Sequence, residues 1–319
     1  MKRRALKIVV PGGSGQVGQI LARRFVARGD DVVVLSRSGR VPAGRAVDWD
    51  GRTLGPWAKE LDGADVVINL AGRSVNCRYT KENLEAMLSS RVDSTRVVGK
   101  AIASASRPPA TWLQMSTATI YAHRYDAPNR ESDGILGGDE PDTPEYWAYS
   151  VRIAREWEAA LAEAPTRATR KVSLRTSMVM SPDEGGVFDV LFRLVRRGLG
   201  GQAGDGKQYV SWITGGDFSR AIDFLIERDD LDGAVNVAAP RPLPNRDFMR
   251  ELRTAAGVRI GLPAARWILG IGAWVMRTDP ELLLKSRRVV PGRLLDAGFR
   301  FDFEEWGAAA RELVKRPRD

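Results

Sequence analysis

The stretch Leu6–Leu21, LKIVVPGGSGQVGQIL, decides how the chain begins to fold. A strand-like apolar run breaks into a loop of four glycines and then resumes with helical spacing. Glycine allows a tight turn and lets backbone N–H groups approach a bound anion, while a helix N-terminus adds partial positive charge. The order strand, glycine loop, helix therefore predicts a dinucleotide-binding turn. Its expected cofactor contacts are Gly12, Gly13, Ser14, Gly15, Gln16, Val17 and Gly18.

The composition is that of an ordinary folded protein without disulfides. The chain has 319 residues, of which 43% are hydrophobic and 28% charged. This is enough for one large domain or two closely joined ones with a substantial core. The single cysteine, Cys77, excludes an internal disulfide and fits a reducing compartment. We therefore expect a cytoplasmic protein, and a homodimer stays open as its assembly.

The net charge of +9 does not by itself indicate a nucleic-acid-binding protein. Basic residues are spread along the chain with acids between them, and excess positive charge equally suits an anionic small ligand. We therefore expect a small-molecule substrate rather than nucleic acid. The apolar run after the N-terminus stops at Pro11, unlike a signal peptide. The apolar stretch Trp267–Met276 is far shorter than the about 20 residues of a membrane span, and it predicts a core or domain-interface helix.

Strand-like and helix-like segments alternate in the first half of the chain. This order predicts a parallel sheet with helices on both faces, and the continuously apolar strands predict burial on both sides. The expected fold class is α/β, a Rossmann-type doubly wound parallel sheet with a smaller, interwoven C-terminal substrate domain. The expected strands are Leu6–Val10, Asp31–Leu35, Asp65–Leu70 and Thr111–Ser116, and the expected helices are Val17–Arg28, Asn83–Ala105 and Tyr149–Glu163.

The pattern loosens after about Met180, where glycines become frequent. We expect residues 1–180 to form the NADP-binding Rossmann domain, with residues 212–240 returning to it. Residues 181–211 and 241–319 then form the smaller substrate domain.

The end of the second strand indicates which dinucleotide is bound. An NAD site usually has an acid about 20 residues after the glycine loop, where it bonds the ribose 2′-hydroxyl. No acid lies between Val32 and Val47, and Ser36, Arg37 and Arg40 stand there instead. A guanidinium suits a 2′-phosphate, so the sequence favours NADP(H) over NAD(H).

The ends of the later strands add cofactor contacts. The third strand ends VDWD, which places Trp49 and Asp50 near the adenine. The fourth ends NLAG, whose small residues let a cofactor pass over the sheet edge. The remaining predicted cofactor contacts are Leu70, Ala71, Gly72 and Ser116.

These motifs occur in the order seen in a known family. VPGGSGQVG, VINLAG, STATIYA and LRTSMVMSP resemble extended short-chain dehydrogenases/reductases of the epimerase/dehydratase type. SWITGGD followed by ELLLKSRRVVPGRLLDAGFRF is similar to the epimerase-like subfamily with its own C-terminal domain. The resemblance covers nearly the whole chain and implies a Rossmann fold that binds NADP(H). Pro11 departs from the motif, which usually has threonine there.

The resemblance implies catalysis by a Ser or Thr together with a Tyr and a Lys four residues apart on one helix. Thr117 matches the hydroxyl and Tyr149 the tyrosine, but Ile153 stands four residues later. The only lysines near this region are at positions 100 and 171. Arg152 is the nearest cation on the Tyr149 face. We therefore expect slow turnover or none, and we expect Ile153→Lys to raise it if the helix face is read correctly.

Other side chains are alternative candidates for catalysis. Tyr121 and His123 follow Thr117 on the same loop. His123 is the only histidine, and its intrinsic pKa suits acid–base chemistry; the alternative is a loop histidine facing solvent. In the wider family an asparagine often completes the site, and Arg91 stands in the matching stretch.

The stretch GLGGQAGDGKQYVSWI is expected to border the substrate cleft. Gln208, Ser211 and Trp212 are the candidate substrate contacts; the alternative is a surface flap and a core tryptophan. The expected function is that of an NADP(H)-dependent epimerase or oxidoreductase with a non-standard site, acting on a small polar or sugar-like substrate. The alternative is an NADP(H)-binding sensor or regulatory module, and no metal site is predicted.

Overall fold

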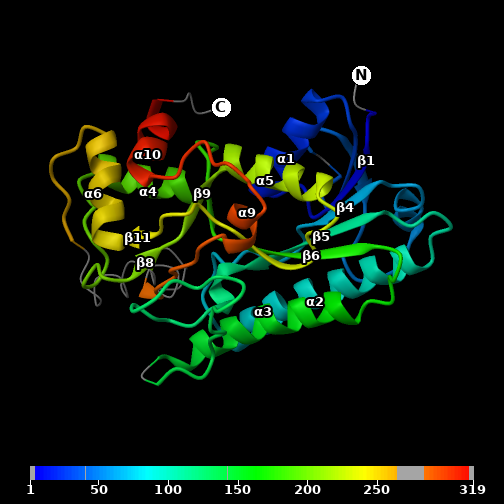
Figure 1. Cartoon of the computed structure of the whole chain (residues 1–319), viewed down its shortest axis with the longest axis horizontal. Helices are drawn as coiled ribbons and strands as arrows, with labels where there is room; N and C mark the ends of the chain where they lie inside the picture. The colour runs from blue at the N-terminus through cyan, green and yellow to red at the C-terminus, as the bar shows by residue number, and fades with distance from the viewer. Residues whose placement is uncertain (1–3, 40, 142, 264–283, 316–319) are drawn as a thin grey trace.

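A parallel sheet of seven strands forms the centre of the molecule (Figure 1). The computed structural model describes residues 4–39, 41–141, 143–263 and 284–315. The strand order is β10-β6-β5-β4-β1-β2-β3, and every neighbouring pair is parallel. The expected fold class is confirmed. The strands are β1 (Lys7–Pro11), β2 (Asp31–Ser36), β3 (Arg45–Asp48), β4 (Val66–Asn69), β5 (Thr111–Thr117), β6 (Arg170–Thr176) and β10 (Gly233–Val237).

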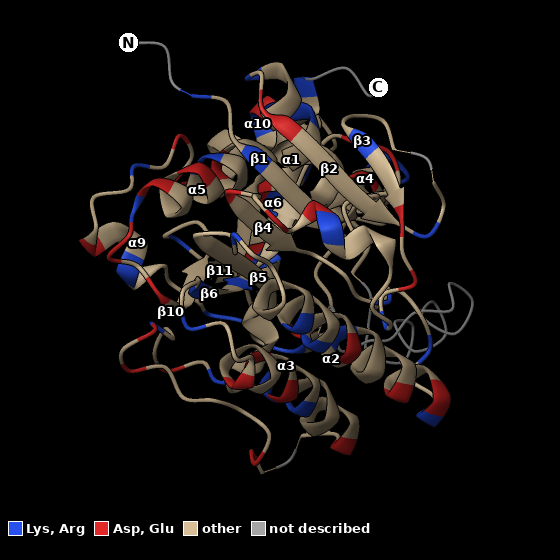
Figure 2. Ribbon diagram, turned by 90° about the vertical axis from the view of Figure 1, so that its right-hand side faces the viewer, with Lys and Arg blue, Asp and Glu red and all other residues tan. Residues whose placement is uncertain are grey.

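Helices cover both faces of this sheet (Figures 1 and 2). Because successive side chains of a strand point to opposite faces, Ile8 and Val10 pack toward α1 and α5, and Val9 packs toward α2 and α3. All three are fully buried, which explains why β1 reads as a continuous apolar run. The covering helices are α1 (Gln16–Ala27) and α5 (Gly215–Glu227) on one face, and α2 (Lys81–Ala103) and α3 (Glu145–Glu163) on the other.

Each crossover returns the chain in the same direction, so α2 and α3 begin at the edge where the parallel strands end. In doubly wound folds ligands bind outside this carboxyl edge. Two short 3-10 turns lie between these elements, η1 (Pro56–Glu60) before β4 and η2 (Ala118–Ile120) after β5. Figure 2 shows basic and acidic residues interspersed along α2, α3 and α5.

A smaller group of elements gathers beside the sheet, at the left of Figure 1. Its core is aromatic: the Trp306 ring stacks on Phe248 with centroids 4.1 Å apart and tilts against Trp212 at 5.1 Å. The elements of this group are β7 (Met178–Met180), α4 (Val187–Arg196), β8 (Tyr209–Val210), β9 (Trp212–Thr214), β11 (Leu243–Pro244), α6 (Asn245–Ala255) and α10 (Trp306–Lys315).

The chain weaves between the two groups. After β9 it returns to the sheet through α5 and β10, and the late helix α9 (Gly292–Asp296) packs against β10. The domain boundaries given above stay a prediction. The stretch Trp267–Met276, predicted as a core or interface helix, lies outside the described residues. Within the described ranges, no helix has both the length and the apolar character needed to cross a membrane.

Candidate functional site

Two glycines of the first loop are required by close packing. Gly12 has a φ of +74°, and a Cβ there would lie 2.6 Å from the Ala71 Cα. A Cβ on Gly18 would lie 2.4 Å from the Gly13 Cα, because α1 starts directly against the loop. Such distances leave no room for a side chain. These glycines therefore hold the loop against the end of β4 and the start of α1.

Gly15 differs from them. Its φ is −74°, and a Cβ there would meet only the Gly12 carbonyl oxygen, at 3.9 Å. The space beside it is open, at the N-terminus of α1. Next to it, the Gln16 Nε2 is buried without a partner among the described residues. This donor packs against Gly186, where a Cβ would lie 1.9 Å from it, so it is the open space beside Gly15 at the helix N-terminus that fits an anionic group such as a diphosphate.

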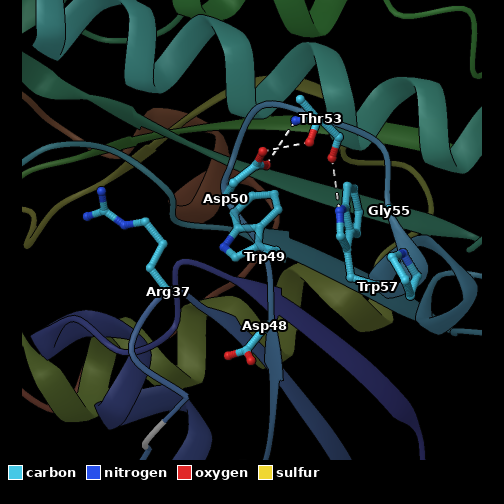
Figure 3. A pocket seen from close by; sticks show the side chains of 8 residues that line it. Arg37, Asp48, Trp49, Asp50, Thr53, Gly55 and Trp57 are labelled. Atoms are coloured by element: carbon cyan, nitrogen blue, oxygen red, sulfur yellow. Dashed lines mark hydrogen bonds between the residues drawn. The ribbon is translucent and has the colours of Figure 1, made fainter.

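A cavity of about 510 Å³ lies at the ends of β2 and β3 (Figure 3). Arg37 is exposed at its mouth and makes no hydrogen bond or ion pair with any described residue. Ser36 is buried, and its Oγ lies 3.0 Å from the Ser38 Oγ. Arg40, the other predicted cation, lies outside the described residues. The cavity is lined by Arg37, Asp48, Trp49, Asp50, Thr53, Gly55, Pro56 and Trp57.

Ring contacts and hydrogen bonds hold the side chains in the wall of this cavity. Trp49 is 7% exposed and meets Trp57 edge to face, with ring centroids 5.3 Å apart. The Asp50 carboxylate accepts the Thr53 hydroxyl at 2.6 Å and the backbone N–H groups of Arg52 and Thr53 at 2.8 and 2.9 Å. The Thr53 hydrogen bonds lower the pKa of Asp50 to about 2. An aromatic wall and a fixed carboxylate are compatible with an adenine, and the adenine contacts of Trp49 and Asp50 stay a prediction.

Arg91 is brought to the same sheet edge from the middle of α2. A Cβ on Gly72 would lie 3.2 Å from the Arg91 Cζ, and the guanidinium stacks over the Trp157 ring at 5.0 Å. It donates one hydrogen bond, to the Met87 carbonyl at 2.9 Å, and no described carboxylate pairs with it. Burial lowers the pKa of Arg91 to about 10, which leaves it charged at neutral pH.

Arg91 lies next to the predicted cofactor path, and no carboxylate among the described residues neutralises its charge. Such a cation fits an anionic ligand. From the sequence, Arg91 is expected only at the position where the wider family often has an asparagine. The contact with Gly72 places it beside the predicted cofactor path. Leu70, Ala71 and Gly72 lie at this edge as predicted, and Asn69 fixes them by accepting the Ala71 N–H at 3.1 Å.

The end of β5 presents one available hydroxyl. Ser116 is 3% exposed, and its Oγ donates to Glu158 at 2.6 Å, so this side chain is engaged inside the fold rather than with a cofactor. The Thr117 Oγ1 is half-buried and accepts the Thr119 N–H at 3.2 Å. Its hydroxyl hydrogen has no acceptor among the described residues, so Thr117 can donate to a substrate oxygen.

Tyr121 is predicted from the sequence as a catalytic candidate, but its side chain is buried and its hydroxyl is already hydrogen-bonded. It is 2% exposed, and its hydroxyl donates to the Asn236 Oδ1 and accepts from the Arg175 Nη1, both at 2.9 Å. Burial raises the pKa of its phenol. Arg175 also forms two hydrogen bonds with Glu158, at 2.9 and 2.8 Å. Tyr121 therefore belongs to a buried polar network that joins β5, β6, β10 and α3.

His123 is also occupied, and it is neither free at the cofactor edge nor a solvent-facing loop residue. Its Nδ1 accepts the backbone N–H of Ser286 at 2.8 Å, and its ring lies edge to face against Tyr125 and Trp147. This arrangement joins the loop after β5 to the C-terminal segment.

Tyr149 lines a second cavity, of about 800 Å³, between the N-terminal parts of α2 and α3. The Arg152 Cζ lies 5.7 Å from the centroid of its ring, but the Arg152 side chain is 61% exposed and donates to Glu156 at 2.6 Å. No hydrogen bond or ring contact between described residues joins Tyr149 to Thr117. The predicted pair is therefore not connected by any such contact, and its joint role in catalysis stays a prediction.

Ile153 lies on the same face of α3 as Tyr149, as the spacing of four residues predicts, but this face is packed against α2. It is 6% exposed and packs with Leu84 and Met87 of α2, and Tyr149 lies at the edge of the same cluster. The position four residues after Tyr149 is therefore part of the α2–α3 interface and not a vacant place for a lysine.

The three predicted substrate contacts are structural. Trp212 is fully buried in the aromatic core, which bears out the alternative of a core tryptophan. Gln208 is 2% exposed and donates to the Ala203 carbonyl at 2.9 Å. Ser211 is 1% exposed, donates to the Arg287 carbonyl at 2.7 Å and accepts the Val289 N–H at 2.9 Å. Burial inside the smaller group of elements removes all three from any cleft.

The described residues contain no group of three or more His, Cys, Asp or Glu side chains that could hold a metal ion.

Comparison with known proteins gives matches along almost the whole chain. The human epimerase family protein SDR39U1 is 30% identical over 312 residues, which cover 97% of this chain and 100% of the relative. The epimerase family protein YfhF of Bacillus subtilis is 27% identical, with 97% and 98% covered. The crystal structure of human SDR39U1 (isoform 2) with NADPH superposes with a TM-score of 0.83 at 28% identity, covering 97% of this chain and 99% of the other.

The family assignment follows from the sequence signatures. Residues 265–313 match a domain of unknown function, DUF1731, in agreement with the C-terminal signature. Residues 8–238 match the NAD dependent epimerase/dehydratase family, and this match spans the glycine loop and all seven strands of the main sheet except the start of β1. The chain belongs to the NAD dependent epimerase/dehydratase family.

Proposed function

We propose that this protein binds NADP(H) across the carboxyl edge of its parallel sheet. The observation that carries the proposal is Gly15, whose open side leaves space for a diphosphate at the N-terminus of α1. The unpaired Arg37 is available to bind a 2′-phosphate at the adenosine end, which favours NADP(H). The human relative is crystallised with NADPH. Arg91 offers a second positive charge, beside Gly72.

We further propose that the protein is an oxidoreductase or epimerase acting on a small polar or sugar-like substrate. Bound NADP(H) supplies or accepts a hydride. Thr117 donates its free hydroxyl hydrogen to the substrate oxygen, and Tyr149, which lines the 800 Å³ cavity between α2 and α3, is the candidate phenol. Arg152 gives a fixed positive charge near that phenol, although Glu156 offsets part of it. Because Arg does not give up its proton, it cannot relay protons as a lysine can.

The burial of Ile153 favours a second candidate function. The helix position that carries a lysine in the wider family is here packed against α2. A protein of this kind can hold NADP(H) without turning it over and report the redox state to a partner. The experiment that separates the two functions is NADPH consumption with a panel of carbonyl substrates, by wild type, Thr117→Ala and Tyr149→Phe.

We also propose that residues 1–180 with 212–240 form the cofactor domain and that the remaining residues form the substrate domain. The return of β10 to the main sheet supports this division. A cytoplasmic location is proposed from the single cysteine.

Arg37→Glu is expected to weaken NADPH binding about 10- to 100-fold, since it removes a charge-assisted phosphate contact and adds a like charge. NADH binding should stay nearly unchanged, because NADH has no 2′-phosphate. Fluorescence titration of both cofactors measures this. An equal loss of affinity for both cofactors in the variant, or no loss for NADPH, contradicts the role given to Arg37.

Arg91→Met is expected to weaken NADPH and NADH alike, by about tenfold or more, because a charged hydrogen bond to a shared part of both cofactors is lost. Methionine keeps an apolar stem against Trp157, so the fold should be retained. Titration of both cofactors checks the result, with circular dichroism as the folding control. If binding is unchanged, Arg91 does not face the cofactor.

A further inference from the structure

The sheet register brings an acid to the place where the sequence lacks one. The last residue of β2, Ser36, pairs with Asp48, the last residue of β3. Asp48 is exposed and lines the 510 Å³ cavity together with Arg37. The acid missing from the end of β2 is therefore supplied by the adjacent strand.

The Asp48 carboxylate is available for a ligand. It forms no hydrogen bond or ion pair with the described residues, and a Cβ on Gly39 would lie 3.3 Å from its Oδ1. It thus lies against the loop that carries Arg37. In Figure 3 the two side chains come from adjacent strand ends, and no dashed line joins them. Asp50, two residues later, already accepts three hydrogen bonds from Arg52 and Thr53.

Opposite charges that line one cavity without pairing act differently on the two cofactors. A carboxylate accepts a hydrogen bond from a free ribose 2′-hydroxyl, as acids do in NAD sites. The same carboxylate repels a 2′-phosphate, which a guanidinium attracts. The repulsion is screened by salt, because the site is exposed and the Debye length at physiological ionic strength is about 8 Å.

We propose that Asp48 is a second determinant of cofactor preference, opposed to Arg37, and that it allows the site to take NADH as well as NADPH. The inference rests on the proposed function, because it concerns the ribose end of the same cofactor site. Asp48 accepts the 2′-hydroxyl of NADH and lowers the affinity for NADPH below what Arg37 alone would give.

The test is a titration of wild type, Asp48→Asn and Asp31→Asn with NADPH and with NADH at low and at physiological salt. Asp31 is an exposed acid at the opposite end of β2, so its variant makes the same charge change away from the cavity. Asp48→Asn is expected to tighten NADPH binding and weaken NADH binding, each by about threefold to tenfold. The gain for NADPH should shrink as salt rises. Asp31→Asn should leave the ratio of the two affinities unchanged.

An unchanged ratio in Asp48→Asn, a shift toward NADH, or the same shift in Asp31→Asn overturns the inference while the proposed function stands. Failure of wild type to bind either cofactor is a separate result, because it refutes the proposed function and the inference with it. Thermal unfolding of both variants confirms that they are folded, since both positions are on the surface.

Discussion

Gly15→Val is expected to lower the affinity for NADPH by about 100-fold or more, while the protein stays folded. The φ of −74° is allowed for any residue, and a Cβ at this position has open space in the protein itself. The valine methyl groups would instead fill the space that the diphosphate needs at the helix N-terminus. Titration with NADPH gives the affinity, and thermal unfolding gives the stability.

The neighbouring glycines provide matched controls. Gly12→Val and Gly18→Val place a side chain within 2.6 Å and 2.4 Å of backbone atoms, so they should lower the stability as well as the affinity. Loss of binding without loss of stability is thus expected only at Gly15. A Gly15→Val protein that binds NADPH as tightly as wild type contradicts the assignment of this loop.

Ile153→Lys is expected to destabilise the protein by about 3–5 kcal/mol rather than to restore activity, because it buries an amine among apolar side chains. Ile153 is 6% exposed between Leu84 and Met87, and none of these neighbours can accept a hydrogen bond through its side chain as a carboxylate would. The sequence alone led to the opposite expectation. Denaturant unfolding of the variant, followed by circular dichroism, measures the change.

Ile153→Met is the control, since a volume-conserving apolar change should cost less than about 1.5 kcal/mol. If Ile153→Lys is as stable as this control and gains reductase activity that Tyr149→Phe then removes, the α2–α3 interface is not packed as described. The original expectation would then hold.

The amino-acid sequence by itself determined the fold class and the cofactor loop. Apolar runs such as that of β1, followed by a glycine turn and a helix, are local patterns, and local patterns report directly on strands buried on both faces. Gly12, Gly15 and Gly18 could be singled out because spacing and context are both contiguous in the chain. The preference for a phosphate-binding cation at Arg37 followed from the same contiguous stretch.

Only the tertiary structure decided which side chains face the cleft. Trp212 and Tyr121 have residue types that suit binding or catalysis, yet packing against Trp306 and hydrogen bonds to Asn236 and Arg175 hold them inside. Ile153 shares a face of α3 with Tyr149, as the spacing of four residues predicts, but that spacing does not reveal that α2 packs against this face and fills the position.

Asp48 and Arg91 are charged residues that the tertiary structure brings to the predicted site although their positions in the sequence do not indicate it. Each lies far in the chain from the segment it approaches, Arg91 beside Gly72 through the crossing of α2, and Asp48 beside Ser36 through the register of β3 on β2. Strand register and helix placement are fixed by the whole core rather than by neighbouring residues. The local sequence therefore determined the backbone that can hold a dinucleotide, and the tertiary packing decided which charges surround it.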